Sequence, residues 1–372
     1  MTPKKNENQK IIDQLQLYYN WAENTKKTYI IHLNKYSKIH NMTLQELIQE
    51  AEQDEETINK VNKRKIKERL MQYILHEKQN NIKITSIKQA ISHIKKMYKH
   101  YDIDIPTLPP LPSDITSETF DELPTKKQIT DILIHTNLKQ KTIITFLAST
   151  GLRRSDACNL TIKNFKEAIK EYVTSQDIIN IIYEIENKDD LIIPTWKIIS
   201  QKTKIKHITF NSDESTRLIC KLLKQRLLKG PLKDNDSLFG YTPPAVSIMF
   251  ERLNDELNLG FVGSKRFFHA HVLRKYFTTS LYNDGVDFLF VDFLAGHALP
   301  PVRAAYYKAN PLELKKVYLE HLDLFTFMSV VSCKEVGLTG DELEELEMLR
   351  EYKKSTDKRL DELESLVRSI LE

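Results

Sequence analysis

The sequence predicts a mainly α-helical chain with a small antiparallel β-sheet, an α+β fold in two parts. Residues 9–102 repeat apolar side chains at helical spacing and contain neither Gly nor Pro, which indicates a run of helices. Residues 191–210 alternate Ile and Thr with polar residues around a Lys-rich turn, a pattern typical of a β-hairpin. Between these regions, five prolines from Pro106 to Pro124 interrupt the helical period. We therefore expect an N-terminal helical part, a stiff linker and a second part that contains the hairpin.

Four helices are expected in the N-terminal part. The first has a start signal at Asn24 and Thr25, and the second follows Thr43, whose hydroxyl can cap a helix. Lysines on the last two helices fit a solvated surface and a phosphate-binding surface equally well. The predicted helices cover residues 22–40, 44–53, 58–79 and 85–101. The cations of the last two are Lys60, Lys63, Arg64, Lys65, Lys67, Lys88, Lys95, Lys96 and Lys99.

The net charge of +4 is divided unevenly along the 372 residues. Residues 333–372 contain seven Lys and Arg against twelve Asp and Glu, a net charge of −5. The other 332 residues carry 48 basic and 39 acidic side chains, a net charge of +9. A basic body favours an acidic partner such as a nucleic acid, whereas the acidic tail is a separate feature.

The acidic tail also has an apolar pattern. Its apolar residues fall on a heptad spacing that Lys353 and Thr356 interrupt. We expect an amphipathic helix or a short coiled coil, packed either on its own chain or on a partner. The spaced residues are Leu346, Leu349, Leu360, Leu363, Val367 and Ile370.

No segment is expected to cross a membrane. The longest apolar run, residues 288–295, contains Asp292 and is far shorter than a bilayer requires, and the N-terminal residues lack a signal-peptide core. A cytoplasmic protein is therefore expected. Three cysteines without a CxxC pair predict neither a disulfide framework nor a zinc site.

The second part contains two blocks of residues suited to binding a phosphate. In the first, Thr150 and Gly151 end a helix, and Arg153 lies just beyond the break. In the second, His271 and Arg274 are three residues apart, so on a helix they share a face. An imidazole and a guanidinium could then bind one oxyanion together, although such a pair also occurs often by chance.

A histidine and two tyrosines follow the second block. His297 comes after an apolar run, and Tyr306 lies nine residues further on, next to Tyr307. Between them, Pro300 and Pro301 stop one segment and start the next helix. A tyrosine at this place is a candidate nucleophile, but tyrosines on amphipathic helices more often serve packing.

Together these blocks resemble the tyrosine recombinase, or phage integrase, family. The family's first motif, T-G-x-R-x-S-E-L, corresponds to residues 150–157, with Asp156 in place of the usual Glu. Its second motif, H-x-L-R, corresponds to residues 271–274. Its last motif, L-G-H followed nine residues later by a nucleophilic Tyr, corresponds to residues 295–297 and Tyr306, with Ala in place of Leu.

The resemblance implies an active site that forms a tyrosine ester with a DNA 3′-phosphate, without a metal ion, a cofactor or ATP. Two arginines would stabilise the phosphorane, and the histidines would share proton transfer and oxygen contacts with a hairpin lysine that acts as general acid. Lys202 fits this lysine best, and Lys204 is the alternative, because a slip of two residues keeps the same face. Tyr306 is the implied nucleophile, and Tyr307 is the alternative. The implied catalytic residues are Arg153, Lys202, His271, Arg274, His297 and Tyr306, with Asp156 supporting Arg153.

The resemblance also implies an organisation. Residues 1–105 would form a helical, SAM-like core-binding domain and residues 125–332 the catalytic domain, joined by a linker at residues 106–124 and followed by the tail helix at residues 333–372. Two domains joined in this way can close around double-stranded DNA as a clamp. The implied contacts to DNA phosphates come from Lys63, Lys65, Lys88, Lys95 and Lys96.

The implied protein is a site-specific recombinase or integrase of an archaeal, viral or other mobile element. It would act in the cytoplasm at the nucleoid, as a homotetramer on two DNA sites through a Holliday junction. Two other functions stay open. A type IB topoisomerase uses the same chemistry as a monomer, and a DNA-binding accessory protein would have lost catalytic residues that this sequence retains.

Overall fold

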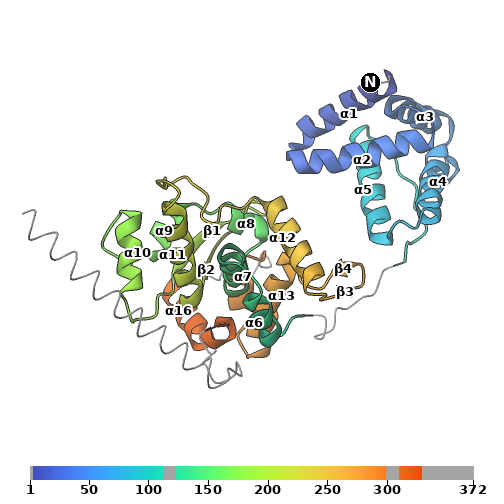
Figure 1. Ribbon diagram of the computed structural model, residues 1–372. Coiled ribbons are helices and arrows are strands. Elements are labelled where there is room, and N and C mark those ends of the chain that lie inside the picture. The colour runs from blue at the N-terminus through green and yellow to red at the C-terminus, as the bar shows by residue number, and fades with distance from the viewer. Residues whose placement is uncertain (1–2, 113–122, 299–309, 329–372) are drawn as a thin grey trace, which may run out of the picture. The chain divides into compact units, whose positions relative to one another are not determined.

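Helices account for nearly all the regular structure in the residues that the computed structural model describes, which are 3–112, 123–298 and 310–328 (Figure 1). The strands in these ranges form two two-stranded antiparallel sheets, so the predicted fold class is confirmed. The chain divides into two units, residues 1–117 and 118–372, each with its own hydrophobic core. No described helix is long and apolar enough to cross a membrane.

The N-terminal unit is a helical bundle. Its elements are α1 (Pro3–Tyr19), α2 (Glu23–Ile39), α3 (Leu44–Thr57), the 3₁₀ helix η1 (Val61–Lys63), α4 (Lys65–Gln79) and α5 (Ile84–His100). Thr43 caps α3 as predicted. Its hydroxyl accepts a hydrogen bond from Glu46 N at 3.1 Å, and the Glu46 carboxylate accepts one from Thr43 N at 2.6 Å. In the core, the buried hydroxyls of Tyr36 and Tyr98 lie 3.0 Å apart and join α2 to α5.

One predicted start signal and one predicted helix start are wrong. The helix α2 begins at Glu23, so Asn24 and Thr25 lie inside it and supply no cap. The helix α4 begins at Lys65 and not at residue 58, because the Asp54 carboxylate of α3 accepts a hydrogen bond from Lys65 N at 2.5 Å. A cap that comes from another helix leaves no local signal in the sequence.

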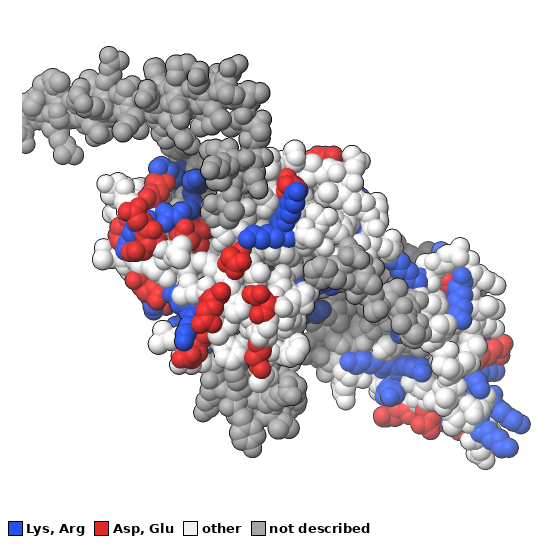
Figure 2. Space-filling view, turned by 90° about the horizontal axis from the view of Figure 1, so that it is seen from below, with Lys and Arg blue, Asp and Glu red and all other residues white. Residues whose placement is uncertain are grey.

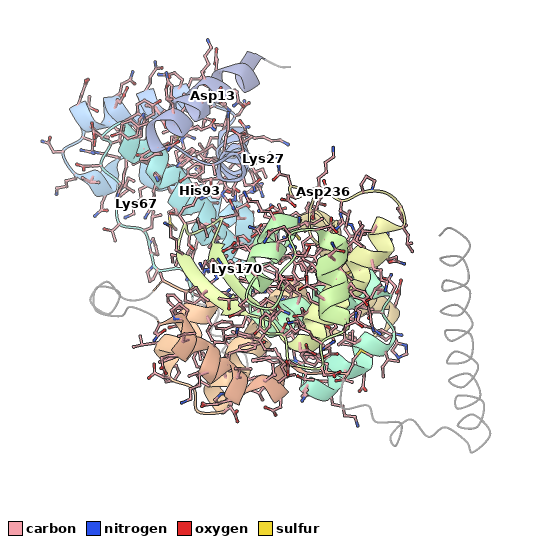
Figure 3. The ribbon with its side chains drawn as sticks, turned by 90° about the vertical axis from the view of Figure 1, so that its left-hand side faces the viewer. Asp13, Lys27, Lys67, His93, Lys170 and Asp236 are labelled. Carbon is pink, nitrogen blue, oxygen red and sulfur yellow. The ribbon has the colours of Figure 1, made fainter. Side chains whose placement is uncertain are left out.

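A stack of aromatic rings also joins α2 to α5. His93, labelled in Figure 3, stacks on Tyr29 with ring centroids 3.8 Å apart, and Trp21 stacks on Tyr29 at 3.7 Å. His93 Nδ1 lies 2.9 Å from Nδ1 of His32, so one ring donates to the other. Burial lowers the pKa of His93 to about 4, so the contact is made between neutral rings at neutral pH.

The start of the predicted linker lies against the N-terminal unit. Residues 103–112 form no helix or strand, but Ile103 is buried in the core of this unit, and Leu108 and Leu111 pack against it. The described part of the proline-rich segment is therefore docked on one unit rather than extended in solvent. Residues 113–122 lie outside the described part of the chain.

The second unit is built around one buried helix. Its elements are α6 (Lys126–Ile134), α7 (Leu138–Thr150), α8 (Arg154–Cys158), α9 (Ile162–Ile169), α10 (Ile178–Glu186), β1 (Thr195–Ile199), β2 (Lys206–Phe210), α11 (Asp213–Leu227), α12 (Pro243–Glu256), β3 (Phe261–Val262), β4 (Lys265–Arg266), α13 (Ala270–Asn283), α14 (Phe288–Ala295), α16 (Pro311–Glu320) and the 3₁₀ helix η3 (Leu322–Phe325). Every residue of α7 from Thr142 to Thr150 is buried, and α11, α13 and β2 pack against it. The predicted hairpin is β1 and β2, which pair antiparallel with Ile198 opposite His207.

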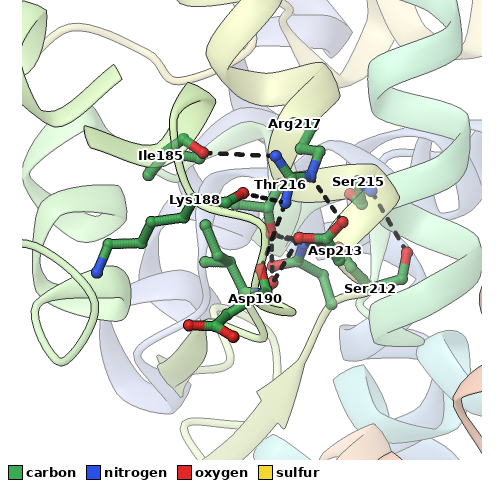
Figure 4. Close-up of polar contacts among 10 residues, drawn as sticks. Ile185, Lys188, Asp190, Ser212, Asp213, Ser215, Thr216 and Arg217 are labelled. Atoms are coloured by element: carbon green, nitrogen blue, oxygen red, sulfur yellow. Dashed lines mark hydrogen bonds and ion pairs between the residues drawn. The ribbon is translucent and has the colours of Figure 1, made fainter. Parts of the chain in front are cut away.

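Arg217 on α11 fixes the segment that leads into this hairpin (Figure 4). Its Nη2 donates hydrogen bonds to the carbonyls of Lys188 and Asp190 at 3.0 and 3.3 Å. Its Nε donates to the Asp213 carboxylate at 2.7 Å, which in turn accepts from Ile192 N at 3.0 Å. The loop before β1 is thus held on α11, and this contact limits how far the hairpin can move.

Candidate active site

The first site residue follows a tight turn at the end of α7. Gly151 ends this helix in the left-handed conformation, with φ of +63°. A Cβ there would lie 2.3 Å from Cδ1 of Phe277 on α13, so only Gly allows the two helices to approach this closely. The chain then turns through Leu152 to Arg153, as the predicted helix break requires.

Arg153 is held by contacts from two other segments. Its Nη1 donates to the Ser200 hydroxyl at 3.2 Å and to the Gly296 carbonyl at 3.3 Å. Ser200 follows β1, and its hydroxyl donates to the buried Asp156 carboxylate at 3.0 Å. Asp156 also accepts a hydrogen bond from Gln201 N at 2.9 Å. The link from Asp156 to Arg153 therefore runs through Ser200 and also fixes the end of the hairpin strand.

Arg274 approaches Arg153 from α13 and is 4% exposed. Its Nη1 donates to the Gly151 carbonyl at 2.7 Å. Its Nη2 is buried and has no hydrogen-bond partner among the described residues. Burial and, to a lesser extent, the charge of Arg153 lower the pKa of Arg274 to about 10, so the guanidinium stays charged at neutral pH. A buried, unpaired guanidinium nitrogen is unfavourable unless an anion binds to it.

Four of the predicted catalytic residues, Arg153, Lys202, His271 and Arg274, line one cleft of about 390 Å³. Lys202 lies in the hairpin turn and reaches this cleft, whereas the runner-up, Lys204, is not among the residues that line it. Burial and, to a lesser extent, the charge of Arg274 lower the pKa of His271, so its ring is neutral at pH 7 and can accept a proton.

His297 is joined to this cleft through the residue before it. The helix α14 ends at Gly296, whose carbonyl contacts Arg153. The Asp292 carboxylate lies 2.7 Å from His297 Nδ1, and it also accepts a hydrogen bond from the Tyr282 hydroxyl at 2.9 Å. Asp292 thereby orients the ring and leaves Nε2 as the nitrogen that can face a substrate. Tyr306 and Tyr307, like the tail at residues 333–372, lie outside the described residues.

Three residues around the site were not predicted from the sequence. Ser200 and Asp292 orient Arg153 and His297, as described above. His207 of β2 is 3% exposed, and its ring lies directly against Gly296. The contacts of Ser200 and His207 join segments that are far apart in the sequence, so no local motif could have revealed them. Asp292 lies only five residues before His297, and the carboxylate at this spacing was a local signal that the prediction from sequence did not use.

Three of the predicted DNA-contacting lysines lie together on α5. Lys88, Lys95 and Lys96 line a hollow of about 540 Å³. Lys96 Nζ lies 4.0 Å from the centroid of the Tyr19 ring, a cation–π contact that holds the ammonium group in place. Lys and Arg are more prominent than Asp and Glu on one face of this unit, at the right of Figure 2.

The other two predicted lysines lie apart from this hollow, beside the start of α4. Lys63 and Lys65 are both exposed, and Lys65 Nζ lies 3.6 Å from the Glu50 carboxylate. Arg64 between them is buried and pairs with Glu55, so its prediction as a surface cation is wrong.

The chain is similar in sequence to a protein of known family. A tyrosine recombinase XerC of Bacillus pumilus (strain SAFR-032) is 25% identical to this chain over 216 residues, which are 57% of this chain and 62% of that protein. This chain thus spans less than two thirds of the length of that relative.

Two solved structures share the fold. The XerH site-specific recombinase in a post-cleavage complex with palindromic difH substrate aligns with a TM-score of 0.51 at 16% identity, over 84% of this chain and 83% of that chain. XerH in a pre-cleavage complex with difH substrate aligns with a TM-score of 0.50 at 18% identity, over the same shares.

The sequence of the second unit matches one family directly. Residues 123–313 match the phage integrase family, which is just over half of the chain. The match includes Arg153 and Arg274 of the cleft, the hairpin with Lys202 and the turn that carries His297. The chain therefore belongs to the phage integrase family.

Proposed function

We propose that this protein is a site-specific DNA recombinase that cuts and rejoins strands through a 3′-phosphotyrosine intermediate, with Tyr306 as its nucleophile. The observation that carries the proposal is the buried Nη2 of Arg274, which has no partner among the described residues and lines a cleft with Arg153. Two guanidiniums from different segments suit the nonbridging oxygens of one phosphate, and their charge would stabilise a phosphorane.

In the proposed reaction, the Tyr306 oxygen attacks phosphorus, a bond from phosphorus to tyrosine forms and the P–O5′ bond breaks. Lys202 gives a proton to the leaving 5′ oxygen, and the neutral His271 accepts the phenol proton. His297 contacts a phosphate oxygen through Nε2. A second 5′ hydroxyl then attacks the tyrosine ester, with the proton transfers reversed. The ester keeps the bond energy, so rejoining needs no ATP, and side-chain cations supply the charge that a metal ion would otherwise provide.

Double-stranded DNA is the proposed partner. The XerC relative is named a tyrosine recombinase, and the XerH structures contain their difH substrate. We place residues 1–105 as a core-binding domain, with Lys63, Lys65, Lys88, Lys95 and Lys96 on DNA phosphates, and residues 125–332 as the catalytic domain. Recombination of two sites would use a homotetramer and a Holliday junction, in the service of a mobile element and at the nucleoid.

A suicide substrate tests the chemistry. A duplex nicked next to the cleavage site traps the covalent adduct, which should form in excess EDTA. Arg274→Ala should slow adduct formation by about 100-fold or more, because one donor to the developing charge is lost. Arg274→Lys should rescue it poorly, since lysine lacks the planar fork. Arg252, exposed on α12 and not among the residues that line the cleft, supplies the matched control Arg252→Ala, which should leave the rate unchanged.

Each other outcome is informative. The absence of any adduct with the wild-type protein on its own site would contradict the proposal. Adduct formation that requires Mg²⁺ would contradict the metal-free step. Relaxation of supercoiled DNA without exchange between two sites would identify a type IB topoisomerase activity instead.

A further inference from the structure

The inward face of β2 contacts both loops that carry site residues. The Thr209 hydroxyl donates to the Thr150 carbonyl at 2.7 Å, at the start of the turn that leads to Arg153. His207, two residues earlier and therefore on the same face, lies against Gly296, which precedes His297. One strand thus sets the spacing between two loops that are far apart in the sequence.

The contact between His207 and Gly296 is close. A Cβ built on Gly296 would lie 2.6 to 2.7 Å from Cε1, Nδ1 and Nε2 of His207, so the edge of the ring fills the place of the missing side chain. Both ring nitrogens are buried, and neither makes a hydrogen bond of normal geometry to a described residue, although the Ile205 backbone lies near enough to raise the pKa of the ring. The ring therefore meets Gly296 through close packing and not through a hydrogen bond to it.

The same glycine is linked to Arg153. Its carbonyl accepts a hydrogen bond from Arg153 Nη1 at 3.3 Å, and a second bond from Nη1 goes to Ser200 at the end of β1. A shift of Gly296 toward β2 would therefore move the partner of Arg153 and the backbone of His297 together.

We infer that His207 is a positioning residue: its neutral ring, seated against Gly296, fixes the Gly296 carbonyl and so directs Arg153 and His297 toward the phosphate. This inference rests on the proposed function. His207 touches no reacting atom in this scheme and acts only through Gly296.

The charges around His207 favour a neutral ring. Burial lowers the pKa of His207 to about 4, and the positive charges of Arg274 and Arg153 act in the same direction. The backbone of Ile205 and the charge of Asp156 act in the opposite direction but are outweighed. Because the folded pKa lies below the ordinary value of about 6.5, the unfolded chain binds the extra proton first as pH falls. The contribution of His207 to stability is therefore intact above about pH 6.5 and declines between that pH and about 4.

Two substitutions at this position separate packing from chemistry. His207→Ala should slow adduct formation on a suicide substrate by about tenfold or more, because Gly296 can collapse toward β2. The DNA dissociation constant should change by less than about threefold, since binding depends on many other phosphate contacts. His207→Leu fills a similar volume and should keep the rate within about threefold of wild type. Ile132→Ala on α6, a buried position outside the site, controls for general destabilisation.

A double variant tests the contact itself. The Gly296→Ala variant should form the adduct slowly. Its methyl group would clash with the His207 ring, and the positive φ of this residue is unfavourable for alanine. Adding His207→Ala makes room for that methyl group, so the two effects on the adduct rate should be less than multiplicative. Independent, multiplying effects would contradict the contact.

Stability at different pH tests the neutral ring. The melting temperature of His207→Leu relative to wild type should rise as pH falls from about 7 to about 5, because only the wild type loses stability by protonating this group on unfolding. A difference in melting temperature between His207→Leu and wild type that does not depend on pH would contradict the inference.

The remaining outcomes are also decisive. If His207→Ala lowers only the melting temperature and leaves the adduct rate unchanged, His207 is merely structural. If His207→Leu is as slow as His207→Ala, the imidazole acts chemically and not by position. Wild-type protein that forms no adduct at all would instead overturn the proposed function, which keeps the two failures apart.

Discussion

Two neighbouring arginines in the cleft repel each other when no anion is present. Arg274 is the more buried, and its lowered pKa of about 10 reflects burial first and Arg153 second. A phosphate placed between them would remove the repulsion and give Nη2 of Arg274 a partner. If the proposed function holds, we expect Arg153 and Arg274 to contribute strongly to binding of the scissile phosphate.

Which of Tyr306 and Tyr307 attacks the phosphate is a prediction about single residues. Adjacent residues on a helix point about 100° apart, so only one of them can face the phosphate. Spacing from His297 favours Tyr306, so Tyr306→Phe should abolish the covalent adduct and leave DNA binding nearly unchanged. Tyr307→Phe should leave the adduct intact. The adduct on a suicide substrate, digested and mapped, identifies the attached residue directly, and reversed phenotypes would make Tyr307 the nucleophile.

Short motifs explain which site residues could be predicted. Arg153, His271 and Arg274 each stand in a local pattern of a few residues, and the fold brings them to one cleft. His207 was not predicted, because its importance comes from a contact with Gly296 across the tertiary structure. A local pattern carries no information about such a contact. Asp292 was missed for another reason, since its contact with His297 is local but belongs to no motif that the prediction used.

Secondary structure was predicted best where each element has its own start and stop signals. Thr43 caps α3 through its own side chain, so the start of this helix is correct. The start of α4 was missed because Asp54 supplies its cap from another helix. The hairpin β1 and β2 was expected from alternation alone, whereas β3 and β4 are too short to give such a signal.

The helix α5 gives a test of the proposed DNA contacts. Charge reversal at Lys95 and Lys96 should weaken association with every DNA sequence, because phosphate contacts do not depend on the bases. The slope of log affinity against log salt concentration should fall in magnitude by about 2, one unit for each lost contact. Fluorescence anisotropy with specific and random duplexes at several salt concentrations measures both effects.

The control variant changes the net charge of the protein by the same amount as the variant at Lys95 and Lys96. Lys27 on α2 and Lys78 on α4 are exposed and do not line the α5 hollow, so their joint reversal should change affinity and slope less. Equal losses from both double variants would show that overall charge, and not the α5 surface, governs binding. A loss confined to one target sequence would mean that Lys95 and Lys96 read bases.

At the scale of the whole molecule, the chain has two separate hydrophobic cores. Residues 1–332 carry a net positive charge. Both features fit a chain of more than one domain. The proline-rich segment predicted a division, and the structure divides into units at residues 1–117 and 118–372. Composition could not predict that residues 103–112 would pack on the first core, because their Ile and Leu are spaced without a period. The sequence likewise gives no means to decide where the acidic tail binds.

The tail provides the last prediction. The described chain ends at Met328, where the half-buried Glu214 carboxylate of α11 accepts hydrogen bonds from the backbone N–H groups of Phe327 and Met328 at 2.7 and 2.9 Å. Deleting residues 340–372 leaves this anchor in place, so the catalytic unit should stay folded and cleave a single site at the wild-type rate. Pairing of two sites and strand exchange should fail, because we expect the heptad apolar residues to dock on a neighbouring copy.

Point variants separate the apolar residues of the tail from its charge, because none of them changes a charged side chain. Leu360→Ala with Leu363→Ala should reproduce the loss of strand exchange, whereas Ser365→Ala, off the heptad seam, should not. Gel assays of two-site complexes, run beside single-site cleavage, measure both steps on the same protein. Normal recombination by the truncated chain would mean that the tail packs on its own chain or has no part in assembly. A truncated chain that no longer cleaves single sites would place the tail inside the catalytic unit, where its apolar side chains would complete that core.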